Sequence, residues 1–165
     1  MKIFLFSIAI IISLACCKSD NAATPQATKP APTEEVNAGP QFQQLPNDIL
    51  LELWNNGTLI DYIFHELPFS MNQSEQASIR TNLTYFSSEA QANIPTECKP
   101  LGRQMFSIDG NIVLESDIYY SDNCAFFVFI MDGETKYANK MSDAGKQFYA
   151  TMIQKGLEAG KQRQG

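Results

Sequence analysis

Two Asp-Gly pairs, Asp109-Gly110 and Asp132-Gly133, each separate two runs in which apolar and polar residues alternate. An Asp-Gly pair between such runs is the strongest short-range sequence signal for a two-residue β-hairpin turn. A third turn signal, Ser121-Asp122-Asn123, lies between the two pairs. Four runs therefore follow one another, over 102–108, 111–120, 124–131 and 134–140. This pattern predicts a four-stranded antiparallel meander.

Helical signals flank the predicted meander on both sides. Leu45-Pro46-Asn47-Asp48 resembles a helix start, and further short helices are expected over 59–66 and 72–83 because apolar residues recur at helical spacing. Asn72 and Glu75 have capping-box spacing at the start of the last of these. Ser142 is expected to cap a C-terminal helix that runs to about residue 159, and 87–100 is expected to be a loop. We therefore predict an α+β fold with N-terminal short helices, a four-stranded antiparallel meander and a C-terminal helix.

The expected turn lengths also divide the side chains between the two faces of the sheet. A two-residue turn at Asp109-Gly110 pairs Ile108 with Asn111, and a three-residue turn at 121–123 pairs Tyr120 with Cys124. One face, which helices would cover, then collects Met105, Ile112, Leu114, Ile118, Phe126, Val128, Ile130 and Tyr137. The other collects Phe106, Val113, Glu115, Asp117, Tyr119, Phe127, Phe129 and Lys136. A one-residue slip in the second turn would exchange the faces of the third strand.

Four residues on the second face are the candidate binding residues: Glu115, Asp117, Phe127 and Phe129. Exposed rings beside charges are typical of a surface that binds a protein or a glycan. The rings would be core residues instead if an N-terminal helix covered them. Two carboxylates on one strand face also occur in glycosidase and Ca²⁺ sites, although a solvated sheet face with Lys136 nearby gives the same pattern.

Composition and missing motifs narrow the function classes. The chain has 12 Lys and Arg against 18 Asp and Glu, and its net charge of −6 argues against nucleic-acid binding. His65 is the single histidine, which excludes a multi-histidine metal site. We therefore predict no catalytic residues, no cofactor and no metal, and favour a non-enzymatic binding module. The alternatives are a small-molecule or ion-binding sensor or inhibitor module and, less favoured, a carboxylate-dependent hydrolase.

Cys98 and Cys124 are expected to form a disulfide. The predicted register places Cys98 opposite about Ser121, at the same end of the sheet as Cys124. Disulfides form and persist in exported proteins. The bond would then join the entry of the first predicted strand to the start of the third.

The first residues have the pattern of a secretory signal. Lys2 precedes an apolar run from Ile3 to Ala15 that is short for a membrane-spanning helix. Cys16 and Cys17 follow, and a small residue before a cysteine at this place resembles the lipobox of bacterial lipoproteins. The resemblance covers only the leader, and it implies cleavage before Cys16 and attachment of lipid to its sulfur. Cys17 is the alternative, because cleavage there puts Leu14 at the usual leucine position.

These patterns divide the chain into three parts. We expect a lipoprotein signal peptide over 1–15, a lipidated cysteine with a disordered Ala/Pro/Thr tether over 16–44, and a single α+β domain over 45–165. The protein would be exported and anchored by its lipid, at the outer membrane, in the periplasm or on the cell surface. Its expected partners are the membrane and an envelope protein or glycan, with no nucleic acid.

Overall fold

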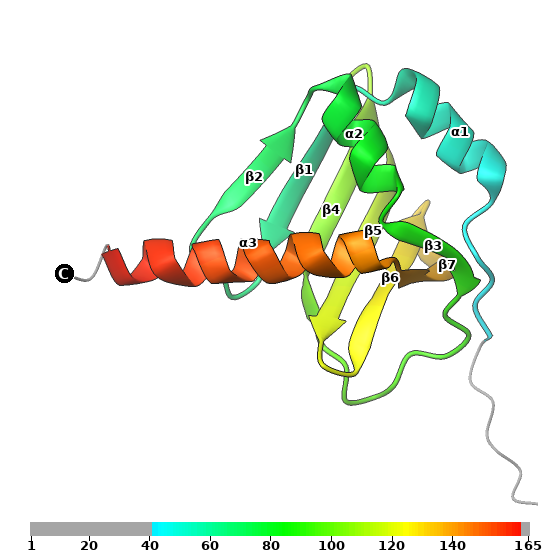
Figure 1. Cartoon of the computed structure of the whole chain (residues 1–165). Coiled ribbons are helices and arrows are strands. Elements are labelled where there is room, and N and C mark those ends of the chain that lie inside the picture. Colours follow the sequence, from blue (N-terminus) through cyan, green and yellow to red (C-terminus); the bar gives the residue numbers. More distant parts are fainter. Residues whose placement is uncertain (1–40, 163–165) are drawn as a thin grey trace, which may run out of the picture. The chain divides into compact units, whose positions relative to one another are not determined.

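The computed structural model of the chain describes residues 41–162, which form an antiparallel sheet and three helices (Figure 1). The elements are α1 (Asn47–Asn56), β1 (Leu59–Phe64), β2 (Ser70–Gln73), α2 (Gln76–Leu83), β3 (Phe86–Ala90), β4 (Pro100–Ile108), β5 (Asn111–Ser121), β6 (Cys124–Met131), β7 (Glu134–Met141) and α3 (Asp143–Gln162). The predicted signal peptide (1–15), Cys16, Cys17 and most of the predicted tether lie outside the described residues.

The sheet has seven strands in the order β2-β1-β4-β5-β6-β7-β3, so the prediction of a four-stranded sheet is wrong. The four predicted strands are present as β4 to β7, and both Asp-Gly turns form, with φ of 48° and 83° at Asp109 and Gly110 and of 54° and 78° at Asp132 and Gly133. Positive φ at both central residues is the type I′ geometry that joins twisted antiparallel strands. The other three strands come from the N-terminal half, which the sequence analysis assigned to helices and a loop.

β1 replaces the helix expected over 59–66. Ile60, Tyr62 and Phe64 are buried at a spacing of two residues, whereas Ile63 is 52% exposed. A short apolar run fits a helix and a strand equally well, and the β-branched and aromatic residues here favour the strand.

β2 and β3 occupy two further segments that were assigned differently. Asn72 lies in β2 and caps no helix, while α2 begins only at Gln76, with no side-chain hydrogen bond from its N-cap residue Glu75. β3 lies at the start of the expected loop. The C-terminal helix α3 is as predicted, and the Ser142 hydroxyl accepts a hydrogen bond from the Gly145 backbone N–H at 3.2 Å.

The observed strand register differs from the predicted register by one residue at two places, on either side of β5. The side chains of β5 therefore lie on the opposite faces from those predicted. Phe106 pairs with Leu114 but Ser107 pairs with Ile112, so Val113 is an extra residue, a β-bulge. The next turn has two residues, because Ser121 pairs with Cys124. The two differences cancel between β4 and β6, so these strands keep their predicted relation, while β5 turns over from Leu114 onward.

β7 also differs from the prediction, because Lys136 is a second extra residue. Phe129 pairs with Tyr137 but Ile130 pairs with Thr135, so Tyr137 shares the face of Phe129 and not that of Val128.

All three helices cover one face of the sheet. Leu53 of α1, Ile79 of α2 and Tyr149 of α3 belong to one buried cluster with the sheet residues that point toward them. These sheet residues are Ile60, Tyr62, Phe64, Phe86, Phe106, Leu114, Ile118, Phe127, Phe129 and Met141. Figure 1 shows α3 running across the strands.

Within residues 41–162, no helix lies on the opposite face, here called the open face. A smaller buried cluster of Cys124, Phe126, Val128 and Ala138 lies on its β6–β7 half, and Phe42, Ile94 and Cys98 pack against that cluster. The segment around Phe42 is held by hydrogen bonds from its N–H to the Ala92 carbonyl and from the Ala138 N–H to the Gln43 carbonyl. Coil therefore covers half of the open face, and the half over β1, β4 and β5 remains accessible.

Candidate functional site

An arginine holds the two candidate carboxylates on the accessible half of the open face. Arg103 of β4 pairs with Asp117 of β5, and its Nε donates to Asp117 Oδ1 at 2.7 Å. Its Nη1 donates to Glu115 Oε2 at 2.9 Å. The hydrogen bond with Asp117 is the largest cause of the raised pKa of Arg103. We call these three residues the arginine cluster.

The arginine cluster is accessible but rigid. The side chains of Arg103, Glu115 and Asp117 are 39%, 33% and 19% exposed. Two charge-assisted hydrogen bonds to carboxylates on one strand fix the guanidinium plane against the sheet. The cluster therefore presents a preorganised set of charged donors and acceptors to solvent.

Phe127 and Phe129 do not lie beside the carboxylates. Both rings are 0% exposed, and each packs edge-on against Phe86, with ring centroids 4.7 and 5.0 Å away. Because β5 is turned over, Asp117 pairs with Val128 and shares its face, while Phe127 and Phe129 face the helices. The predicted four-residue binding face is wrong for these two rings, which are core residues.

Apolar side chains surround the arginine cluster on the accessible half-face. Ile63 is opposite Arg103 on β1, and Met105 is opposite Glu115 on β5. Tyr119 stacks on Phe126 with ring centroids 4.5 Å apart. The accessible half-face therefore consists of Asp61, Ile63, Arg103, Met105, Glu115, Asp117 and Tyr119.

The predicted disulfide is confirmed. Cys98 and Cys124 are bonded, with their Cα atoms 5.8 Å apart. The bond ties the coil 91–99, which carries Ile94, to the start of β6. It thereby fixes the border between the covered and accessible halves of the open face.

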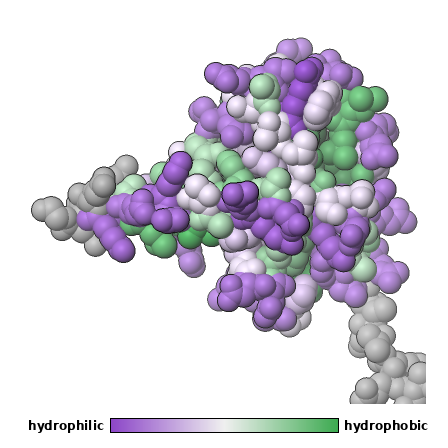
Figure 2. All heavy atoms as spheres, viewed as in Figure 1, coloured by the Kyte–Doolittle hydropathy of each residue, from purple (hydrophilic) through white to green (hydrophobic). Residues whose placement is uncertain are grey.

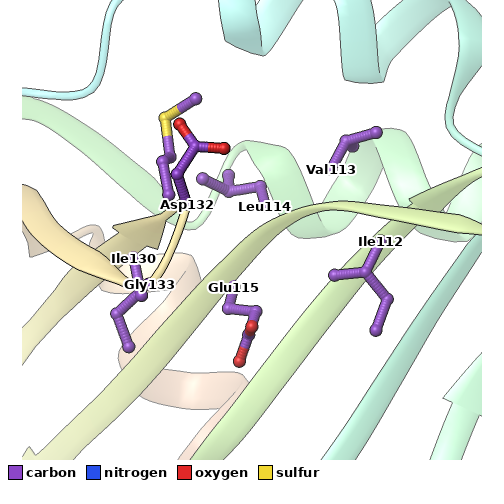
Figure 3. A pocket seen from close by; sticks show the side chains of 8 residues that line it. Ile112, Val113, Leu114, Glu115, Ile130, Asp132 and Gly133 are labelled. Atoms are coloured by element: carbon purple, nitrogen blue, oxygen red, sulfur yellow. The ribbon is translucent and has the colours of Figure 1, made fainter.

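A notch separates the tips of the two type I′ hairpins. Glu115 and Ile130 form the last pair between β5 and β6, and both hairpins continue beyond it. Each hairpin carries a register shift near this level, at Phe106/Ser107 and at Phe129/Ile130. The notch has a volume of about 230 Å³, and in Figure 3 its Glu115, Ile130 and Ile112 side chains point to one side of the strands while Asp132 and Val113 point to the other.

The helix-covered side also has apolar surface. Figure 2 shows hydrophobic residues over α1, where Leu51 is 60% exposed. Trp54 of the same helix is 39% exposed and lies under the Arg80 guanidinium, 5.4 Å from the ring centroid. Arg80 Nε also donates to the Trp54 carbonyl at 3.0 Å, so α1 and α2 are joined at this point.

A buried polar network lies between the helices and the sheet. The Tyr62 hydroxyl donates to Gln73 Oε1 at 3.0 Å and accepts from Asn82 Nδ2 at 2.6 Å, and the Tyr149 hydroxyl donates to Gln104 Oε1 at 3.0 Å. Burial raises the pKa of both phenols above the usual value of 10.0. Side chains fill this space, so the network positions α2 and α3.

Neither a metal centre nor a membrane helix is found in the described part of the chain. Within residues 41–162, no three His, Cys, Asp or Glu side chains are grouped so that they could hold a metal ion. None of the helices there is both long and apolar enough to cross a bilayer.

Comparison with known proteins gives no match: no family model, no curated protein and no solved structure is similar to this chain. Function is therefore inferred from the sequence and the structure of the chain itself.

Arg103 is the site residue that the sequence analysis missed. In the predicted register it lay opposite Ser116 and on the other face from Glu115 and Asp117. The Val113 bulge shifts the pairing by one residue and brings the three side chains together. The sequence did contain a signal for Arg103. If one extra residue is allowed in the hairpin between β4 and β5, Arg103 is placed opposite Asp117, and such an opposite-charge pair across two strands is favourable.

Proposed function

We propose that this chain is an exported, lipid-anchored cell-envelope protein whose domain binds a partner protein through the accessible half-face. The arginine cluster is the observation that carries the binding proposal. The lipobox-type leader is the basis for export and anchoring, and the disulfide supports an oxidising compartment.

The accessible half-face has the chemistry of a protein interface. Ile63 is 52% exposed beside Arg103, whose side chain is 39% exposed. The half-face also carries Met105 and Tyr119, and arginine, tyrosine and methionine are enriched at protein interfaces. The carboxylates fix the guanidinium before binding, so little conformational entropy is lost when a partner contacts it. A flat, rigid, mixed surface of this kind favours a protein over a small molecule.

A hydrolase that uses Glu115 and Asp117 fits the geometry less well. Both carboxylates accept hydrogen bonds from one guanidinium. A glycosidase pair needs one protonated carboxylic acid and one free carboxylate that flank a substrate. Here both groups are held together by the same cation. Glu115 lines the notch between the hairpin tips but Asp117 does not, so the two carboxylates do not flank one cleft.

Site-specific photo-crosslinking in the native envelope tests the binding proposal. A photoreactive residue is placed at Ile63, and a matched control is placed at Leu51 on α1, which is 60% exposed. We expect a discrete protein adduct from Ile63 and none from Leu51. The adduct should fall at least about tenfold when Arg103→Ala is added, as expected for a central interface arginine.

The same experiment can contradict the proposal. Equal adducts from both positions would show that the half-face has no specific partner. An Ile63 adduct that persists with Arg103→Ala would place binding on this face but outside the arginine cluster.

A further inference from the structure

The two ends of the sheet are protected very differently. β3 carries a register shift and Glu89, whose carboxylate binds Lys140 Nζ at 2.7 Å, and the Phe42 N–H bonds to the Ala92 carbonyl just after β3. Bulges, charges and covering segments are the usual means of keeping an edge strand from pairing with another chain. β2, which ends the sheet on the other side, is short, with four residues, but within Ser70–Gln73 it carries no bulge, no charge and no covering segment.

α3 lies close against the start of this unprotected strand. A Cβ at Gly156 would collide with the Phe69 ring, and one at Gly160 would lie 3.5 Å from Pro68, so the two glycines let the helix approach. A hollow of about 220 Å³ remains beside Phe69, lined also by Met152, Lys155, Gly156 and Ala159. In Figure 1 the C-terminal end of α3 continues past the start of β2.

We propose that two copies of this chain associate through β2, pairing antiparallel about a two-fold axis at Met71. If this axis is perpendicular to the sheet, the helices of both copies lie on the same side of the joined sheet. A residue of one β2 and the residue directly opposite it in the other β2 then point to the same face. Because side chains alternate between the two faces along a strand, both residue numbers are odd or both are even, and their sum is even. With the axis at Met71, Ser70 lies opposite Asn72 of the second copy, and Phe69 lies opposite its Gln73.

Burial and charge both favour this axis. Met71 faces the helix side, so the axis brings the two Met71 side chains together and within diagonal reach of Phe69 and its hollow. Lys155 of α3 lines the hollow beside Phe69, at the end of β2 that would lie next to Gln73 of the second copy. A chain of net charge −6 thus meets its copy through an uncharged strand, with a lysine beside it at each end.

Cysteine crosslinking of the full chain tests the contact and its register. Ser70 and Asn72 are exposed and point away from the helices, so Ser70→Cys and Asn72→Cys leave the core unchanged. In the proposed register, the Cα atoms of Ser70 and of Asn72 in the second copy are about 5 Å apart, a distance that a disulfide can span. The two copies of Ser70, or the two copies of Asn72, are offset by two positions along the strands, and their Cα atoms are about 8 Å apart, which is too far for a disulfide. We therefore expect an oxidant to produce a reducible band of doubled mass when the two variants are expressed together.

The controls separate this result from other crosslinks. The band should be about fivefold or more stronger in the co-expression than with either variant alone. The parent chain gives the background from Cys16 and Cys17, and Ser88→Cys, exposed on β3 at the protected edge, should not exceed it. A strong band from Asn72→Cys alone would overturn the axis at Met71. Background bands in every sample would overturn association through β2.

Discussion

Tyr149 is fully buried in α3 and donates its hydroxyl hydrogen to Gln104 Oε1 at 3.0 Å. The Gln104 amide nitrogen has no hydrogen-bond partner within the described residues, so this bond is the one that its side chain makes there. We expect Tyr149→Phe to lower the free energy of unfolding by about 1–3 kcal/mol, because it leaves a buried acceptor unpaired. Tyr120→Phe is the control, since that hydroxyl makes no hydrogen bond within residues 41–162. Urea denaturation measures both, and equal losses would contradict the role given to the bond.

The buried phenols also predict how stability depends on pH. Burial raises the pKa of Tyr62 and Tyr149 above 10.0, the value for an exposed tyrosine. The folded state therefore holds these protons more tightly than the unfolded state. Their contribution to stability is complete below about pH 10 and is lost as the pH rises toward the folded-state pKa values.

Tyrosinate absorbance checks this prediction. Tyr62 and Tyr149 should ionise only together with the loss of far-ultraviolet circular dichroism, so part of the tyrosinate absorbance should appear in step with unfolding. A complete tyrosinate signal from a chain that is still folded would contradict the prediction.

At the scale of elements, the Val113 bulge takes up one extra residue in the hairpin between β4 and β5. Deleting Val113 removes the one residue of this hairpin arm that has no partner on β4, and it leaves the pairs Ser107–Ile112, Phe106–Leu114 and Met105–Glu115 as they are. Glu115 and Asp117 therefore stay on the open face with Arg103, and Leu114 stays in the core. We expect the deletion variant to fold and to unfold cooperatively in thermal melts. A deletion variant without a cooperative transition would contradict the account.

The disulfide gives a second prediction for an element, the coil 91–99. The bonded cysteines are 26 residues apart, and removing a crosslink of this span costs roughly 3–4 kcal/mol on the chain-entropy model. We expect the Cys98→Ser and Cys124→Ser double variant to lose this much in urea denaturation and to expose the ring of Phe126. Limited proteolysis should cut first near Ile94. A stability loss under about 1 kcal/mol would show that the coil is held by packing alone.

The strands β4 to β7 could be predicted from the sequence because the two Asp-Gly turns and the alternating runs agreed with the final structure, although the turn before Cys124 is one residue shorter than expected. The Asp-Gly turns demand positive φ, and alternating residues follow on both sides of them. β1 could not be assigned because Ile60, Ile63 and Phe64 fit helical spacing as well as alternation, and its partner β4 lies far along the chain. The disulfide was predictable because both cysteines lie at the same end of the sheet. Arg103 was not, because one bulged residue reverses which side chains meet.

For the whole molecule, the lipobox-type leader predicts that one cysteine carries the protein to a membrane. We expect Cys16→Ser to abolish incorporation of labelled fatty acid and to move the chain to the soluble fraction, since stable anchoring needs more than one acyl chain. Cys17→Ser should leave both unchanged. The reverse pattern would assign the lipid to Cys17, and labelling that survives both changes would contradict lipid anchoring.

The order of strands in the sheet has a consequence for how the chain is made. β1 and β3 are synthesised before β4 and β7, the strands against which they pair, and α2 lies between β2 and β3 at opposite edges about 29 Å apart. An isolated β1–β2 hairpin is at best marginally stable in water. β1 therefore has no partner beyond β2 until β4 has left the ribosome, and β3 has none until β7, the last strand, has followed. A nascent chain of this design stays unfolded through most of its synthesis, which is the state in which a polypeptide can be threaded through a translocation pore.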